Sequence, residues 1–383
     1  MIAWRGLSPE TGEPIEVRID GGKIEEIRPY EGRDLSASVW LLPGLIDIQV
    51  NGYGGYDFND PDVTPDTVRA AVQALWADGV TYCCPTVITA PPEAMLRSLR
   101  AIRDACRDPA IDRSIVGVHV EGPFISAEDG PRGAHPRDAV RPPDWSEFER
   151  WQEASGGRVR IVTLAPELPG AIPFIQRLAA EGVVPAIGHT GAAPEQIRDA
   201  VSAGARLSTH LGNGCHGVLP RHPNYLWEQA AADDLWASLI VDGHHLPPAV
   251  VKCLVRCKRP SHVILVSDAI AAAGLGPGHF RLGAQEVVVD ESLRCSLEGS
   301  GYLAGSVIPL RLGVANVARF ADVSFREAVA MATAHPARLL GVDARLGALR
   351  PGMEASLLLA RWQPGDADVE VLRVMHAGVE LPV

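Results

Sequence analysis

Four apolar runs in this chain each end on a side chain that can bind a metal ion or move a proton. They lead into Glu121, His189, His210 and Asp268. Continuous apolar runs are typical of the buried strands of a parallel sheet. In a (β/α)8 barrel, the C-terminal ends of such strands hold the catalytic residues. One carboxylate and two imidazoles, with a further carboxylate beside them, are the ligands and the base of a hydrolytic metal site.

Helical patterns that close on a glycine and lead at once into a short apolar strand recur through the middle of the chain. The first covers Thr67–Ala77, closes at Gly79 and runs into a strand that begins at Val80. The pattern returns over residues 173–189, 192–210 and 248–268. Such alternation is the αβ half of a βαβ unit. It predicts an α/β fold, a (β/α)8 TIM-like barrel over residues 44–346, with an open doubly wound sheet as the alternative.

The two ends of the chain have a different pattern from the middle. Residues 14–20 alternate apolar and polar side chains, Gly21 and Gly22 form a turn, and residues 23–27 alternate again, which predicts a β-hairpin. Near the other end, residues 355–359 and 369–374 are also strand-like. We therefore expect a small β-sandwich domain formed by both termini, residues 1–43 and 347–383.

Composition and charge exclude several classes of function. The net charge of -12 argues against a nucleic-acid partner, because binding to phosphate backbones needs a basic surface. No apolar stretch reaches the ~18 residues of a membrane helix, and the first residues lack the apolar core of a signal peptide. The 7 cysteines have no regular spacing and are interpreted as reduced. We expect a cytoplasmic protein that acts on a small molecule.

Glu121, His189 and His210 come from three separate predicted strands, which favours a catalytic metal over a structural one. Zn²⁺ is the default for this ligand set, and Fe²⁺, Co²⁺ or Mn²⁺ would also fit. Taken singly, a histidine at a strand end is more often a hydrogen-bonded structural residue. The first predicted barrel strand carries Gln49 and Asn51, whose neutral amides are poor zinc ligands, so we expect one metal ion per chain.

Asp268 follows four aliphatic residues and precedes a run of small ones. A carboxylate at the mouth of a dry barrel can accept a proton and pass it to a leaving group. The alternative is that Asp268 caps the N-terminus of a helix.

These residues occur within a set of motifs, and with them the chain resembles the N-acetylglucosamine-6-phosphate deacetylases of the amidohydrolase superfamily. The resemblance covers nearly the whole chain. Its most specific motifs are residues 119–124, 164–167, 188–190, 209–211, 241–245, 267–269 and 303–306. It implies an amidohydrolase-type barrel, one divalent metal, a homodimer whose partner helps to close the site, and hydrolysis of the acetamide of an amino-sugar phosphate.

The resemblance also implies a role for each matching residue. Glu121, His189 and His210 correspond to metal ligands, and Asp268 corresponds to the catalytic acid and base. His135 corresponds to a histidine that hydrogen-bonds the amide or its oxyanion. The implied substrate-binding residues are His135, Asn213, Gly214, Arg221 and His245, of which Asn213, Gly214 and Arg221 hold the phosphate. The alternatives are a solvated loop histidine for His135, a turn residue for Asn213 and a surface cation for Arg221.

The loop after His210 departs from the family pattern. His216, His222 and Trp227 are additions that could form a different pocket floor. This departure leaves two alternatives open. The nearer is an amidohydrolase for another N-acyl sugar, an N-acyl amino acid or a cyclic amide. The more distant is a sugar-phosphate-binding protein without activity, which the complete ligand set and Asp268 argue against.

Overall fold

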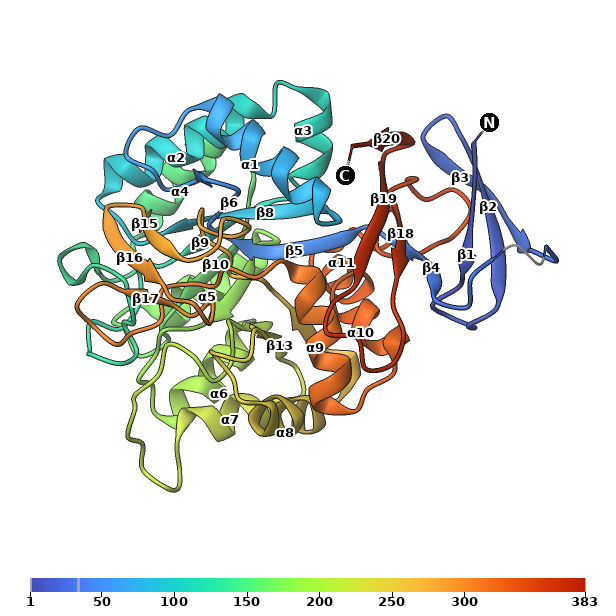
Figure 1. The fold of residues 1–383 in the computed structure, drawn as a ribbon. Coiled ribbons are helices and arrows are strands. Elements are labelled where there is room, and N and C mark those ends of the chain that lie inside the picture. Colours follow the sequence, from blue (N-terminus) through green and yellow to red (C-terminus); the bar gives the residue numbers. More distant parts are fainter. Residues whose placement is uncertain (1, 33–34, 383) are drawn as a thin grey trace.

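The predicted (β/α)8 barrel is present in the computed structural model, which describes residues 2–32 and 35–382 (Figure 1). Within this part of the chain, parallel strands follow one another in the order β14-β13-β12-β11-β10-β9-β8-β5. A parallel bridge between Val50 and Ala269 joins the two edges of this sheet. The strands are β5 (Leu45–Val50), β8 (Val80–Ile88), β9 (Val118–Glu121), β10 (Val159–Leu164), β11 (Val184–Ile187), β12 (Leu207–Ser208), β13 (Trp236–Leu239) and β14 (Val263–Leu265).

Helices cover the outside of the barrel, as Figure 1 shows. In the first of them, Val68, Val72 and Leu75 are buried, the spacing of one helical face turned towards the strands. Thr64 caps that helix, and Pro65 occupies its first position, where no N–H is needed. The α-helices are α1 (Pro65–Ala77), α2 (Pro92–Ala105), α3 (Pro109–Ser114), α4 (Trp145–Ser155), α5 (Ala171–Ala180), α6 (Pro194–Ala203), α7 (Tyr225–Ala231), α8 (Pro248–Lys258), α9 (Leu310–Ala321), α10 (Phe325–Met331) and α11 (Ala334–Leu339). Short 3₁₀ turns cover Arg137–Ala139 and Pro260–His262.

The barrel strands are buried on both faces, as their apolar sequences predict. Ile46 and Ile48 on β5 point into a cluster with Ile161, Ala186 and Leu207 from other barrel strands. Leu45 and Val50 on β5, Val162 on β10 and Ile187 on β11 belong instead to the larger cluster against the helices. The filled interior gives the barrel a rigid floor beneath its open end.

Strands from both ends of the chain form one sheet, the small β domain expected from the terminal patterns. The order is β20-β19-β18-β4-β1-β2-β3. The predicted hairpin is confirmed, because β2 and β3 pair antiparallel from Ile15 and Pro29 to Asp20 and Lys23. The domain boundaries themselves stay a prediction. The strands are β1 (Ile2–Leu7), β2 (Pro14–Asp20), β3 (Lys23–Pro29), β4 (Val39–Pro43), β18 (Leu357–Arg361), β19 (Glu370–His376) and β20 (Val379–Leu381).

A second antiparallel sheet lies on the opposite side of the barrel from the terminal sheet in Figure 1. It consists of β15 (Gly278–Leu282), β16 (Gln285–Val289) and β17 (Cys295–Leu297), between β14 and α9. Gln285 donates its amide N–H to the carbonyl of Ala134, which ties this sheet to the loop after β9. A short pair, β6 (Gly52–Tyr53) and β7 (Tyr56–Asp57), follows β5. Among the described helices, we find none with both the length and the apolar character needed to cross a membrane.

Candidate active site

The four side chains at which the apolar runs end lie together at one end of the barrel. Glu121 is the last residue of β9, and His189 and His210 each follow their strand by two residues. His189, His210 and Asp268 have positive φ angles of 51, 31 and 48 degrees. Non-glycine residues rarely adopt this conformation, and it costs free energy that concentrates at functional sites. The chain therefore turns sharply where each strand ends, and all four side chains are buried.

Three ligand atoms converge in this cluster. The Oε1 atom of Glu121 lies 3.1 Å from Nε2 of His189 and 2.9 Å from Nε2 of His210, and the two Nε2 atoms are 3.2 Å apart. His189 donates its Nδ1–H to the carbonyl of Pro131, so Nε2 is the ring nitrogen left to bind a metal. Converging lone pairs at these separations suit a divalent cation with bonds of about 2.0–2.2 Å. Among the residues described, this is the one group with metal-ligand geometry.

Burial raises the pKa of Glu121, but its hydrogen bonds with His189 and His210 outweigh burial and hold that pKa well below its usual range. The carboxylate therefore stays anionic, as a metal ligand must.

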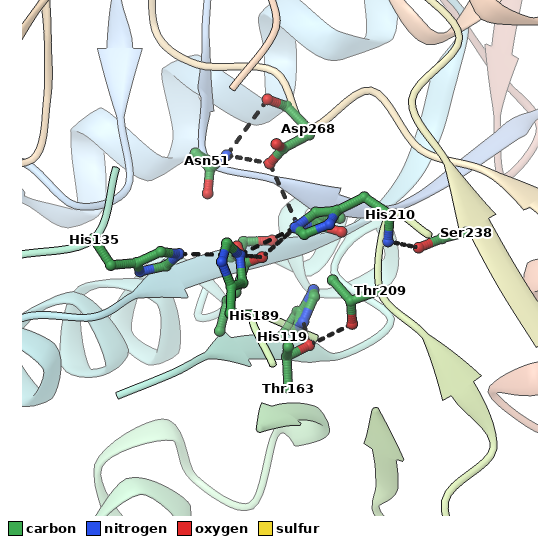
Figure 2. A network of polar contacts seen from close by, with 12 residues as sticks. Asn51, His119, His135, Thr163, His189, Thr209, His210, Ser238 and Asp268 are labelled. Atoms are coloured by element: carbon green, nitrogen blue, oxygen red, sulfur yellow. Dashed lines mark hydrogen bonds and ion pairs between the residues drawn. The ribbon is translucent and has the colours of Figure 1, made fainter. Parts of the chain in front are cut away.

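Gln49 and Asn51 direct their amide groups at the carboxylates of the site. Gln49 donates Nε2–H to Oε1 of Glu121 at 2.9 Å. Asn51 donates Nδ2–H to Oδ1 of Asp268 at 2.8 Å (Figure 2). An amide binds a metal through its oxygen, and both residues turn an N–H group, not the oxygen, towards the carboxylate. Both contacts support the expectation of a single metal ion.

Asp268 lies at the mouth of the barrel beside the cluster. Burial raises its pKa to about 7, and the charge of Glu121 adds to the effect. A carboxyl group with a pKa near neutrality can both accept and donate a proton. No helix begins at Asp268 in the described chain, because Ala269 bridges to Val50 and Ser306 and a turn over residues 271–275 follows. The helix-cap alternative is therefore wrong.

His135 lies on the loop after β9 and is buried, not solvated as the alternative interpretation had it. Its Nε2 lies 3.2 Å from Nε2 of His189, and its Nδ1 is buried without a hydrogen-bond partner. Burial, followed by the charge of His189, lowers the pKa of His135 to about 3. The ring is therefore neutral and keeps one N–H to donate to a ligand.

A second layer of polar side chains lies beneath the cluster. His119 on β9 hydrogen-bonds the hydroxyl of Thr163 at 2.7 Å, and Thr163 in turn lies 2.7 Å from the hydroxyl of Thr209 (Figure 2). Ser238 on β13 accepts the backbone N–H of His210. These bonds link four barrel strands directly below the ligands. Such outer contacts hold ligand side chains in their orientation.

A cavity of about 340 Å³ opens above the cluster, within the size range of small-molecule sites. Asn213, Gly214 and His245 line it together with His135. The Nδ2 group of Asn213 is buried and has no hydrogen-bond partner, so it is free to donate to a ligand. A Cβ on Gly214 would lie 2.8 Å from Nδ1 of His189, so the backbone passes directly beside a proposed metal ligand. The Nδ1 of His245 bonds Asp242 at 2.7 Å, which fixes its ring.

Four other residues from the loop after His210 lie outside the cavity. Arg221 and His222 are exposed and do not belong to its lining. Trp227, on α7, is 56% exposed, so it is not part of a pocket floor. His216 bonds Glu128 at 2.9 Å and the hydroxyl of Tyr225 at 2.9 Å. The additions to this loop therefore do not reshape the cavity of a single chain.

One wall of the cavity was not predicted from the sequence. Leu282, Gln285, Arg294 and Tyr302 line it from the β15–β17 sheet and the segment that follows. Alternation of apolar and polar residues over 278–289, with Gly283 in the middle, is a hairpin signal that could have identified this sheet. Nothing in that pattern shows which way the sheet folds back.

Proteins with similar sequences and structures cover almost the whole chain. The amidohydrolase family matches residues 40–381. N-acetylgalactosamine-6-phosphate deacetylase of Escherichia coli O157:H7 is 33% identical over 361 residues, 94% of this chain and 94% of that protein. N-acetylglucosamine-6-phosphate deacetylase of Bacillus subtilis is 32% identical over 372 residues, 94% of this chain and 91% of that protein.

A solved structure agrees with these relatives. It is that of a mutant N-acetyl-D-glucosamine-6-phosphate deacetylase from Mycobacterium smegmatis in complex with N-acetyl-D-glucosamine-6-phosphate. Its TM-score is 0.85 at 30% identity, and the match covers 97% of this chain and 95% of that one.

Proposed function

The chain belongs to the amidohydrolase family, and on that premise we propose that it is a metal-dependent deacetylase of an N-acetylated amino-sugar phosphate. N-acetylglucosamine 6-phosphate is the first candidate substrate, and the products are the amino-sugar phosphate and acetate. The observation that carries the proposal is the convergence of Glu121, His189 and His210 beside Asp268 at the floor of the cavity. Relatives with deacetylase activity in their names match over 94% of this chain.

Glu121, His189 and His210 would hold one divalent ion, with Zn²⁺ as the default and Fe²⁺, Co²⁺ or Mn²⁺ as alternatives. Such an ion, when bound, polarises a carbonyl group and lowers the pKa of water towards 7.

Asp268 transfers the proton of the reaction, and His135 stabilises the negative charge that develops on the amide oxygen. Asp268, with its pKa raised to about 7 by burial, takes the proton of the attacking water and returns it to the leaving nitrogen as the C–N bond breaks. Asn51 holds the Asp268 carboxylate in place during both transfers. His135 donates its N–H to the amide oxygen as negative charge develops there, an effect worth on the order of 3 kcal/mol.

The sugar phosphate would lie along Asn213, Gly214 and His245, which line the same cavity. Arg221 is exposed on its loop and would reach a phosphate only in the site of a second subunit. The proposal therefore includes a homodimer in which each subunit's Arg221 closes the other's site. The cytoplasmic location expected from the sequence stays a prediction.

A rate panel tests this proposal. Purified, metal-loaded protein is assayed with the 6-phosphates of N-acetylglucosamine and N-acetylgalactosamine, both unphosphorylated sugars, and several N-acyl amino acids. We expect acetate release from a sugar 6-phosphate to have the highest kcat/KM. The ratio of the kcat/KM values for the two sugar 6-phosphates then shows which stereochemistry at C4 the enzyme prefers. A preference for N-acyl amino acids would favour the alternative of a different amidohydrolase. No turnover of any compound, with metal bound, would reject both.

A further inference from the structure

Arg294 occupies a distinctive place in the cavity. It comes from the segment that leads into β17, the wall that the sequence patterns did not identify. Among the described residues that line the cavity, Arg294 is the one arginine or lysine. Glu121 and Asp268 line the same cavity. A dianionic ligand would therefore meet two carboxylates on the floor and one permanent cation, on the wall.

The guanidinium of Arg294 is incompletely paired. Its Nη2 donates to the carbonyl of Gly301 at 3.0 Å. In the described chain, no carboxylate lies within ion-pair distance of it. Arg281, on the same small sheet, shows the contrast, because its Nε lies 2.9 Å from Glu286. Because Arg294 lines the cavity and has no carboxylate beside it, its positive charge is available to a ligand there.

Neighbouring contacts hold Arg294 in position. Its backbone N–H donates to Oδ1 of Asp290 at 3.0 Å, which closes the turn before β17. His244 donates its Nε2–H to the carbonyl of Ser292 at 2.9 Å. This bond joins the turn to the loop that carries His245, another residue of the cavity wall. The turn that carries Arg294 is therefore held by hydrogen bonds, and Arg294 lines the same cavity as His245.

We propose that Arg294 binds the phosphate of the substrate within its own subunit and thereby determines the preference for phosphorylated sugars. This inference rests on the proposed function and deepens it. One N–H group is used on Gly301, and the remaining donors of the planar guanidinium can form paired hydrogen bonds with phosphate oxygens. Arg294 thus supplies a cation in cis, independent of any Arg221 from a partner subunit.

Substitution of Arg294 tests the proposal by separating two substrates. In Arg294→Gln we expect KM for the sugar 6-phosphate to rise roughly 10- to 100-fold. We expect kcat/KM for the unphosphorylated sugar to change less than about 3-fold. Arg294→Lys keeps the positive charge but lacks the planar guanidinium, so its KM for the sugar 6-phosphate should lie between those of the wild type and Arg294→Gln. Arg281→Gln is the matched control on the same sheet and should leave KM for both sugars unchanged.

The outcomes distinguish this inference from the proposed function. Loss of the preference for the phosphorylated sugar in Arg294→Gln, with the control intact, supports Arg294 as the phosphate ligand. Equal losses of kcat/KM for both sugars would show that Arg294 only stabilises the segment of Gly301. That result would overturn the inference while the proposed function stands. An unchanged preference would overturn it too. A wild-type enzyme without any preference for the phosphorylated sugar would reject both proposals.

Discussion

The two sides of the cavity are built in different ways. We call Glu121, His189, His210 and Asp268 the strand-end cluster, and Asn213, His245 and Arg294 the loop wall. Members of the cluster are buried at the ends of barrel strands, hydrogen-bonded to one another or to Gln49 and Asn51, and supported from below. The loop wall stands on connecting segments, and two of its three members carry incompletely used donors.

Under the proposed function, this difference places the chemistry on one side and substrate recognition on the other. Groups that bind a metal and move protons need positions held to a fraction of an ångström, which strands provide better than loops. Groups with spare donors can pair with a ligand without first breaking internal bonds. Substitutions in the cluster should therefore remove metal or turnover, while substitutions in the wall should change KM.

The largest effect is expected from removal of a ligand. Glu121→Ala should lower bound metal from about one equivalent per chain to almost none, with loss of activity, because the one carboxylate of the set is gone. Metal analysis of the purified variant measures this. Glu128→Ala is the control, since Glu128 pairs with His216 outside the cavity. Two equivalents per chain in the wild type, both needed for turnover, would contradict the single-ion site.

Asp268→Asn should keep its metal and lose turnover. The amide cannot carry the proton, so we expect kcat to fall roughly 10²- to 10⁴-fold. Metal content and substrate binding, measured by calorimetry, serve as the controls. A near-normal rate in this variant would remove Asp268 from the mechanism and would place proton transfer elsewhere in the cavity.

Asn213→Ala probes the loop wall. Its Nδ2 group has no partner within the protein, so its removal should cost little stability and should raise KM roughly 10-fold with kcat nearly unchanged. Steady-state kinetics and a thermal melt measure the two effects. A fall in kcat with KM unaltered would contradict the division between the two sides.

Asp47→Asn tests the support beneath the cluster and should affect activity least. Burial raises the pKa of Asp47 to about 7, while one of its oxygens accepts the N–H groups of Gln49 and Ser267. As the pH rises, the Asp47 carboxyl group therefore stays protonated in the folded state after it has lost its proton in the unfolded chain. The stability from this group is thus fully present below about pH 4 and is lost as the pH rises towards 7.

Urea unfolding at pH 5 and pH 8 measures the expected difference. The free energy of unfolding of the wild type should fall by roughly 2–4 kcal/mol more than that of Asp47→Asn between these values. Parallel changes in the two proteins would show that Asp47 is ionised in both states.

The amino-acid sequence by itself determined the barrel, the terminal sheet and the identity of the cluster. Apolar runs such as residues 263–266 indicate buried strands, and a polar residue directly after such a run is expected at a strand end. His189 and His210 could therefore be named as candidates from the joint pattern of the runs, and the family resemblance implied their role as metal ligands. Gln49 and Asn51 could likewise be recognised as substitutes for ligands, although not as donors to Glu121 and Asp268.

Only the tertiary structure decided what faces the cluster. Arg221 and Arg294 are both arginines in irregular segments, and no local pattern distinguishes them. One is exposed on a protruding loop, and the other lines the cavity, because β15–β17 folds back over the barrel mouth and is tied to the loops of Ala134 and His244. Those ties join residues distant in sequence, and their geometry depends on the whole barrel. The periodicity of a strand specifies its own faces, but not the surface against which it packs.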